Sequence, residues 1–149
     1  MAYLPPRTAT DAEGGKPETF DFLGFTHICG NTRQGKFCVL RKTKANKVKA
    51  KLAEIKAQLR RRLHGSVPET GSWLKAVLTG HYRYYGVPRN YRALSVFRWR
   101  VVDLWRRSLS RRSGKSRITW EKMGQLEQRW LPRPRIMHPY PSQRLCVTT

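Results

Sequence analysis

A stripe of apolar residues between Val48 and Leu63 narrows the possible folds of this chain to those built around a long helix. Its members recur at steps of four and three residues, in the series Val48, Leu52, Ile55, Leu59 and Leu63. At about 100° per residue, this spacing confines them to one arc of an α-helix. The sequence therefore predicts a helix from Lys44 to about His64 that buries this stripe.

The segment before this helix has the composition of β-structure. Residues 20–29 and 36–42 are rich in aromatic and β-branched side chains, and the sequence GNTRQG between them has glycine at both ends. Such runs separated by a glycine-containing turn are typical of antiparallel strands. We expect one β-hairpin over residues 20–42.

Three further helices are predicted downstream. The second begins after SVPETGS, with Ser72 as its N-cap, and ends at Gly86-Val87-Pro88. The third runs from Asn90, a good N-cap, to about Ser110. The fourth is capped by Thr119 and presents four apolar residues on one side: Trp120, Met123, Leu126 and Trp130.

The expected fold is therefore mainly α, with an N-terminal β-hairpin followed by a bundle of three to four helices and an extended tail. Residues 1–19 read as a flexible leader, 20–42 as the hairpin and 43–131 as the helical domain. Residues 132–149 contain repeated prolines, which favour an extended strap packed on the surface.

Charge limits the partners of this fold. The chain holds 31 Lys and Arg against 9 Asp and Glu, a net charge of +22. Residues 41–64 carry ten cations and one Glu, and residues 90–117 carry nine cations and one Asp. The positive charges crowded onto these two helices repel one another unless a polyanion neutralises them, and nucleic acid is the commonest polyanion. An anionic membrane surface is the rival partner.

Aromatic residues in TGHYRYYGVPRN (79–90) either fill the core or grip a ligand. His81 and Tyr85 fall on the apolar stripe of the second helix, and Tyr82 and Tyr84 flank it, so we interpret His81 as structural. Trp99 lies instead on the polar side of the third helix, between Arg92 and Arg106. It is a candidate for stacking on bases, and burial under the hairpin or tail is the alternative.

Three cysteines without a CxxC pair suit a reducing cytoplasm better than a disulfide framework. Zinc binding through His27, Cys29 and Cys38 is an alternative, although their spacing matches no usual four-ligand pattern. No apolar run approaches the ~20 residues of a membrane-spanning helix, and the N-terminus lacks the layout of a signal peptide.

Four motifs together resemble one family. FDFLGFTHICG followed by a basic helix, then WLKAVLTGHYRYYGVPRN, ITWEKM and RWLPRPRIMHPYP, resemble the C-terminal part of group II intron-encoded reverse transcriptases, also called maturases. The resemblance covers roughly Gly15 to Leu145. It implies that the helices form the thumb, or maturase (X) domain, and that FLGF lies where the polymerase palm ends. The chain looks like a truncated copy that begins where a palm should already be complete.

The resemblance also implies what this chain lacks. The family polymerase holds two Mg²⁺ ions with clustered carboxylates on a Tyr-x-Asp-Asp strand and another Asp. Here Asp11, Asp21 and Asp103 are never adjacent. We therefore expect no catalysis, no metal and no cofactor, and a palm-containing reverse transcriptase fragment is a possible partner. Phe22, Leu23 and Phe25 should be partly exposed where that palm would lie.

The leading prediction is an RNA-binding maturase domain that stabilises structured group II intron RNA during splicing. Two alternatives are a helical DNA-binding module and a decayed fragment without function. The residues expected to bind RNA are the cations of the first and third helices with the candidate stacking ring: Lys47, Lys49, Lys51, Lys56, Arg60, Arg61, Arg92, Trp99, Arg100, Arg106, Arg107 and Arg111.

Overall fold

The computed structural model describes residues 18–31, 33–112, 114 and 117–139. Three strands precede four helices: β1 (Thr19–Phe22), β2 (Phe25–Asn31), β3 (Phe37–Thr43), α1 (Ala45–Arg61), α2 (Val67–Tyr85), α3 (Tyr91–Arg112) and α4 (Trp120–Trp130). This order confirms the predicted mainly α fold with β-structure at its N-terminal end. The expected leader up to residue 17 and the end of the tail, residues 140–149, lie outside the described residues.

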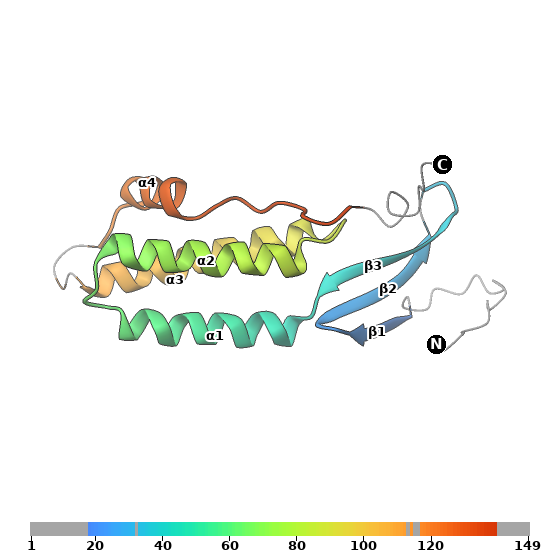
Figure 1. Ribbon diagram of the computed structural model, residues 1–149, viewed down its shortest axis with the longest axis horizontal. Coiled ribbons are helices and arrows are strands. Elements are labelled where there is room, and N and C mark those ends of the chain that lie inside the picture. Colours follow the sequence, from blue (N-terminus) through green and yellow to red (C-terminus); the bar gives the residue numbers. More distant parts are fainter. Residues whose placement is uncertain (1–17, 32, 113, 115–116, 140–149) are drawn as a thin grey trace, which may run out of the picture.

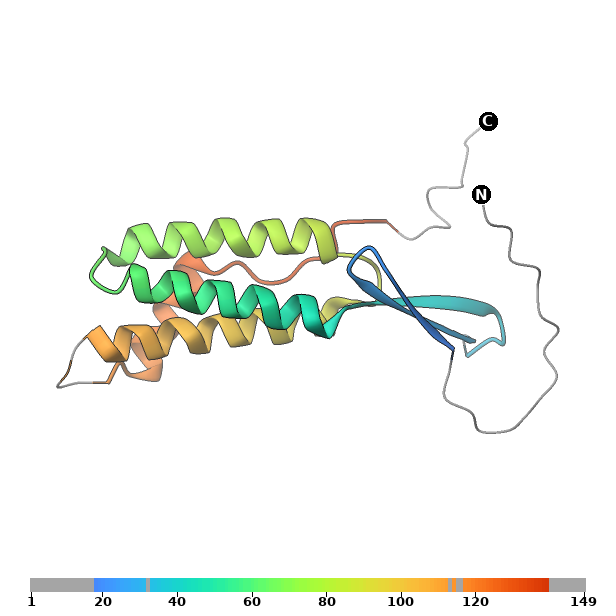
Figure 2. The same cartoon turned by 90° about the horizontal axis from the view of Figure 1, so that it is seen from below.

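The helices form three layers. α2 and α3 make the middle layer, α1 covers one side of it, and α4 with the segment 132–139 covers the other (Figures 1 and 2). We call residues 132–139 the strap. The sheet extends from the end of the bundle at which α1 and α3 begin and α2 ends (Figure 1). The two cation-rich helices, α1 and α3, pack directly against each other.

The sheet has one strand more than the predicted hairpin. Its order is β1-β2-β3, all antiparallel, with Phe22 paired to Phe25 and Cys29 paired to Val39. Leu23 and Gly24 both have positive φ, 49° and 82°, which is the requirement of a two-residue type I′ hairpin turn. The interpretation of 20–29 as one strand was wrong because a leucine at positive φ is uncommon and the run shows no break in apolar character.

Two helix boundaries differ from the predicted ones. Ser66 is the N-cap of α2, since its hydroxyl accepts a hydrogen bond from the Glu69 amide at 3.3 Å, and Pro68 lies in the first turn. Ser72 was therefore the wrong cap, and it lies exposed inside the helix. Proline is tolerated in the first turn because the amides there have no intrahelical acceptor. α1 ends at Arg61, before the predicted end near His64.

The core lies where the predicted stripe of α1 meets the buried faces of α2 and α3. Leu52, Ile55 and Leu59 are buried, as the periodicity predicted. They join seven buried residues of the neighbouring helices: Leu74, Leu78, Leu94, Phe97, Val101, Val102 and Trp105. Tyr82 also belongs to this core, contrary to the expectation that it flanks the stripe. Its hydroxyl donates to the Pro132 carbonyl at 2.8 Å, which satisfies the one polar group of the ring.

The strap is held by hydrogen bonds to α2 and α3. Arg98 donates to the carbonyls of Leu131 and Pro132 and forms an ion pair with Glu127 of α4. Further along, the amides of Met137 and His138 both donate to the Gly86 carbonyl. A Cβ at Gly86 would lie 2.9 Å from the Arg135 carbonyl oxygen, so the strap can approach this closely only because glycine is there.

One of the four residues predicted on the apolar side of α4 is not buried. Thr119 caps it as expected, accepting from the Lys122 amide at 3.3 Å, and Met123 is fully buried. Leu126 and Trp130 pack partly against the core. Trp120, however, is 63% exposed, and the Arg106 guanidinium lies over its ring at 4.5 Å from the centroid. The first turn of α4 therefore projects beyond the core.

Asn90 joins the sheet to the bundle. Only 1% of it is exposed. Its side-chain NH₂ donates to the Thr43 hydroxyl and to the Tyr85 carbonyl, both at 2.8 Å, and its side-chain oxygen accepts from the Thr43 amide at 3.2 Å. The residue precedes α3 as predicted, but its side chain links the end of β3 to the end of α2 and is not used to cap α3.

We expect Asn90→Ala to lower the free energy of unfolding by about 2–3 kcal/mol, because it leaves buried polar groups of Thr43 and Tyr85 without partners. Urea denaturation followed by circular dichroism measures this loss. Ser72→Ala is the matched control and should change stability by less than about 0.5 kcal/mol, since Ser72 is exposed. Equal effects of the two changes would contradict the linking role of Asn90.

Candidate nucleic-acid interface

A continuous groove runs between α1 and α3. Two adjoining depressions form it, and both are lined by Lys56, Leu104 and Arg107. The structure brings six of the twelve predicted RNA-binding residues to this groove: Lys56, Arg60, Trp99, Arg100, Arg107 and Arg111. All six are exposed. We call this set the basic groove.

Helical spacing explains why these side chains meet. Lys56 and Arg60 are four residues apart on α1, and Arg100, Arg107 and Arg111 are seven and four apart on α3, so each set follows one side of its helix. The apolar residues beside them draw the two helices together. As a result, two rows of cations face the same channel, with Leu104 between them.

Asp103 is the acidic residue among those that line the groove, and its place there was not predicted. Its carboxylate oxygens lie 3.1 Å from Arg106 and 2.9 Å from Arg107. The i,i+3 and i,i+4 spacing was the available signal for these pairs. Because both pairs are partly exposed, we assign them a positioning role for the two guanidinium groups and no large contribution to stability.

Trp99 lies at the edge of the basic groove with 63% of its surface exposed. Neither the sheet nor the described part of the tail buries it, so the alternative of a buried ring is wrong. Its expected neighbour Arg106 turns away, toward Asp103 and the ring of Trp120. An exposed tryptophan beside cations is available for stacking on a base.

The other predicted residues lie outside the basic groove. Lys47 and Lys51 line a separate depression between α1 and α2, where the Lys51 ammonium is 3.2 Å from the Glu54 carboxylate. Arg106 is half-buried against α4. The remaining three are exposed on α1 and α3 and line neither depression: Lys49, Arg61 and Arg92.

His81 is part of the core. It is 8% exposed and stacks on Phe97, with ring centroids 3.7 Å apart and planes 9° apart. Burial and, secondarily, the positive charge of Lys51 lower its pKa from 6.5 to about 4. The imidazole is therefore neutral at pH 7, which agrees with the interpretation of His81 as a structural residue.

Replacing His81 by Leu should preserve RNA affinity and change the response of stability to pH. In the wild type the unfolded state binds a proton below pH 6.5 and the folded state does so only near pH 4. Unfolding free energy should therefore fall by up to about 3 kcal/mol between pH 7 and pH 4 because of His81. In His81→Leu, the fall in unfolding free energy between pH 7 and pH 4 should be smaller by this amount. Urea denaturation of both proteins at pH 7 and at pH 4 measures the difference. Lost RNA binding in a variant that melts normally would assign His81 to the interface.

The described residues give less support to a metal ion or a membrane as the ligand. No group of three His, Cys, Asp or Glu gathers there to hold a metal ion. The register places Cys38 opposite Gly30, on the other face of the sheet from His27 and Cys29, which separates the three candidate zinc ligands. Among the described helices, none is both long and apolar enough to span a bilayer.

Comparison with known proteins adds no relative. No family model matches the chain, and neither a curated protein nor a solved structure matches it. The resemblance to maturases therefore stays a prediction from the sequence motifs.

Proposed function

We propose that this protein is an RNA-binding domain of the maturase type, which binds structured group II intron RNA and supports its splicing. The observation that carries the proposal is the basic groove between α1 and α3. It aligns five exposed cations and one exposed tryptophan along a single channel, and the one carboxylate among its lining residues is paired with arginines.

The groove suits the chemistry of folded RNA. Double-stranded RNA hides its base edges in a deep, narrow major groove, so proteins recognise it chiefly through phosphates, 2′-hydroxyls and shape. Five cations spread over two helices can contact several phosphates of such a helix at once. Trp99 adds a flat apolar surface at the rim, on which a base from a loop or bulge can stack.

Polymerisation is not part of the proposed function. Among the described carboxylates, Asp21 accepts from Thr26 and pairs with Lys44 in the sheet region, whereas Asp103 pairs with arginines on α3. This arrangement brings no two aspartates together for a pair of metal ions. We propose that splicing support requires a palm-containing chain as partner, and that the protein works in the reducing cytoplasm, where Cys29 and Cys38 stay as thiols.

The DNA-binding alternative has less support. α3 offers many arginines but contains no Asn or Gln, the side chains that pair with adenine in the major groove. A footprint with strong preference for one DNA sequence would favour that alternative.

Replacing Trp99 by Ala tests where RNA lies. If RNA occupies the basic groove, Trp99→Ala should weaken binding by about 1–3 kcal/mol with little change in melting temperature. Trp120→Ala is the matched control, because Trp120 is equally exposed, at 63%, but lies on α4 outside the groove. Fluorescence anisotropy with a hairpin-loop RNA measures both affinities. Equal losses, or a greater loss for Trp120→Ala, would contradict this placement.

A further inference from the structure

One face of the sheet carries exposed aromatic rings. Alternation along the paired strands places Phe20, Phe22, His27, Phe37 and Arg41 on the same face. The exposed fractions are 52% for Phe20, 60% for Phe22 and 71% for Phe37. We call these five residues the aromatic face. Phe25 belongs to the same side but is buried against Tyr84 and Tyr85, contrary to the expectation that it is exposed.

The rings of the aromatic face are arranged as flat surfaces. Phe20 stacks on His27 with centroids 4.7 Å apart and planes only 4° apart. Phe22 follows two residues later on the same strand, with its centroid 6.4 Å from that of His27. Both phenylalanine side chains are more than half exposed, and exposed aromatic rings on the open face of a sheet are a means by which sheets stack unpaired bases.

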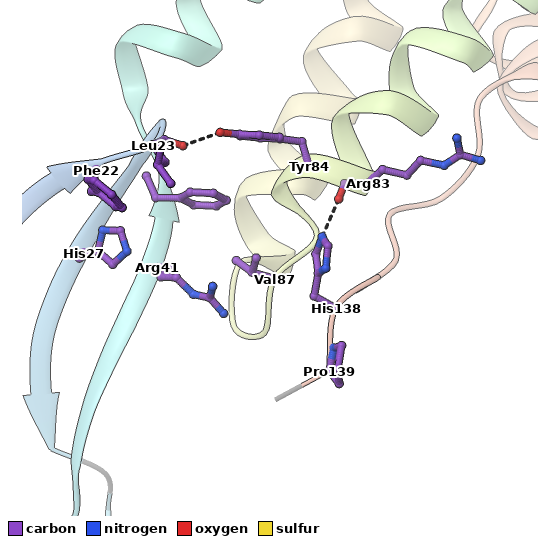
Figure 3. A pocket seen from close by; sticks show the side chains of 10 residues that line it. Phe22, Leu23, His27, Arg41, Arg83, Tyr84, Val87, His138 and Pro139 are labelled. Atoms are coloured by element: carbon purple, nitrogen blue, oxygen red, sulfur yellow. Dashed lines mark hydrogen bonds between the residues drawn. The ribbon is translucent and has the colours of Figure 1, made fainter. Parts of the chain in front are cut away.

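A cationic gap adjoins these rings. Phe22 and His27 line one side of it, and Tyr84, Val87 and His138 line the other (Figure 3). Arg41 points from β3 into the gap, whereas the Arg83 side chain extends away from it (Figure 3). The opening has a volume of about 500 Å³, and its lining includes no carboxylate.

His138 fixes the far wall of this gap. Its Nε2 donates to the Arg83 carbonyl at 2.6 Å, and its backbone amide donates to the Gly86 carbonyl. On the near side, the Tyr84 hydroxyl donates to the Leu23 carbonyl at 2.8 Å (Figure 3). The gap is therefore bounded by hydrogen-bonded elements that hold sheet, helix and strap at a set spacing.

We propose that the aromatic face is a second RNA site, which binds unpaired nucleotides by stacking bases on Phe20 and Phe22 while Arg41 contacts a phosphate. The proposal rests on the proposed RNA-binding function and deepens it. The basic groove takes the phosphates of a folded helix, and the aromatic face, on the sheet that extends from one end of the bundle, takes a single-stranded extension of that helix. The preferred RNA is then a helix that carries a single-stranded extension.

Charge favours RNA over a protein as the occupant. Arg41 lies beside the rings, and none of the ion pairs among the described residues involves it, so its guanidinium is available to a phosphate. A chain with a net charge of +22 also attracts polyanions to every open surface. Stacking on an aromatic ring is tolerant of base identity, so we expect little sequence preference at this site.

The test compares two RNAs that share one hairpin, one blunt and one with a six-nucleotide 3′ or 5′ extension containing 2-aminopurine. For the wild type we expect the extension to raise affinity at least about tenfold and to quench the 2-aminopurine fluorescence by stacking. Phe20→Leu with Phe22→Leu should remove both effects while leaving affinity for the blunt hairpin unchanged. Leucine keeps the apolar character of the sheet, and circular dichroism checks that the variant folds.

Control variants separate this proposal from the proposed function. Tyr91→Leu removes an exposed ring, 50% exposed, at the start of α3 and should keep the full gain from the extension. Phe22→Trp should also keep it, because indole stacks at least as well as phenyl. The second site would be overturned if the wild-type protein binds both RNAs equally, or if the double leucine variant keeps the higher affinity for the extended RNA. Neither result would contradict RNA binding by the basic groove. Failure to bind the blunt hairpin would overturn the groove itself.

Self-association is the remaining outcome that the same variants detect. If the aromatic face joins two copies of the chain, sedimentation of the wild type without RNA will show a dimer. The double leucine variant will then show weaker dimerisation and an unaltered response to the extension. That result would replace RNA by a second copy as the occupant of the face.

Discussion

Raising monovalent salt from 50 mM to 200 mM will weaken binding of structured RNA by about 10³- to 10⁵-fold. This range corresponds to about 6–10 phosphate contacts, each of which releases condensed counterions when it forms. The basic groove supplies five cations, and further exposed cations lie beside it on α1 and α3. A salt titration by filter binding gives the number of contacts from the slope of log affinity against log salt.

Neutralising the groove should reduce that slope by about four. The variant carries glutamine at Lys56, Arg60, Arg100 and Arg107, each expected to contact one phosphate. A matched control removes the same charge from α4 and the strap, which cover the other side of the middle layer, with glutamine at the exposed residues Lys122, Arg129, Arg133 and Arg135. We expect the control to keep most of the wild-type slope. Equal slopes for the two variants would show that total charge, and not the groove, determines binding.

Replacing Phe97 by Ala will lower the free energy of unfolding by about 3–5 kcal/mol, because a fully buried ring is removed from the middle layer. The same change removes the ring on which His81 stacks and admits water to it. The pKa of His81 should therefore rise from about 4 toward 6.5. Urea denaturation measures the first effect and proton NMR titration the second.

Phe97→Leu is the comparison variant for this experiment. It should lower the free energy of unfolding by less than Phe97→Ala does, since leucine fills most of the space that the phenylalanine ring occupies. If Phe97→Ala costs less than about 1 kcal/mol, or if the His81 pKa does not move, then Phe97 and His81 do not form the packed centre described above.

Local sequence signals predicted those parts of the fold that depend on periodicity alone. The stripe of α1 is buried at Leu52, Ile55 and Leu59, and Thr119 caps α4, because spacing and capping chemistry act within one helix. The turn at Leu23-Gly24 was missed because leucine rarely adopts positive φ. Asn90 was interpreted as a cap because nothing local shows that Thr43, 47 residues away, is its partner.

The candidate site could be predicted by residue type but not by arrangement. Eleven cations on two helices and one candidate stacking ring made up the twelve predicted residues, and the packing of α1 on α3 divides them into six that line one groove and six that do not. Arg106 illustrates the limit. It shares a helix with Arg107, but the positions of Asp103 and Trp120 turn its guanidinium toward α4.

Filter binding of the purified protein to a folded group II intron, with a length-matched tRNA as competitor, tests the central claim most directly. Both RNAs are polyanions of equal charge, so general electrostatic attraction affects them alike. We predict that the intron is retained at protein concentrations at least about tenfold below those that retain the tRNA, and that this preference disappears in the groove variant. Equal retention of the two RNAs by the wild-type protein would contradict the assignment as a maturase-type domain.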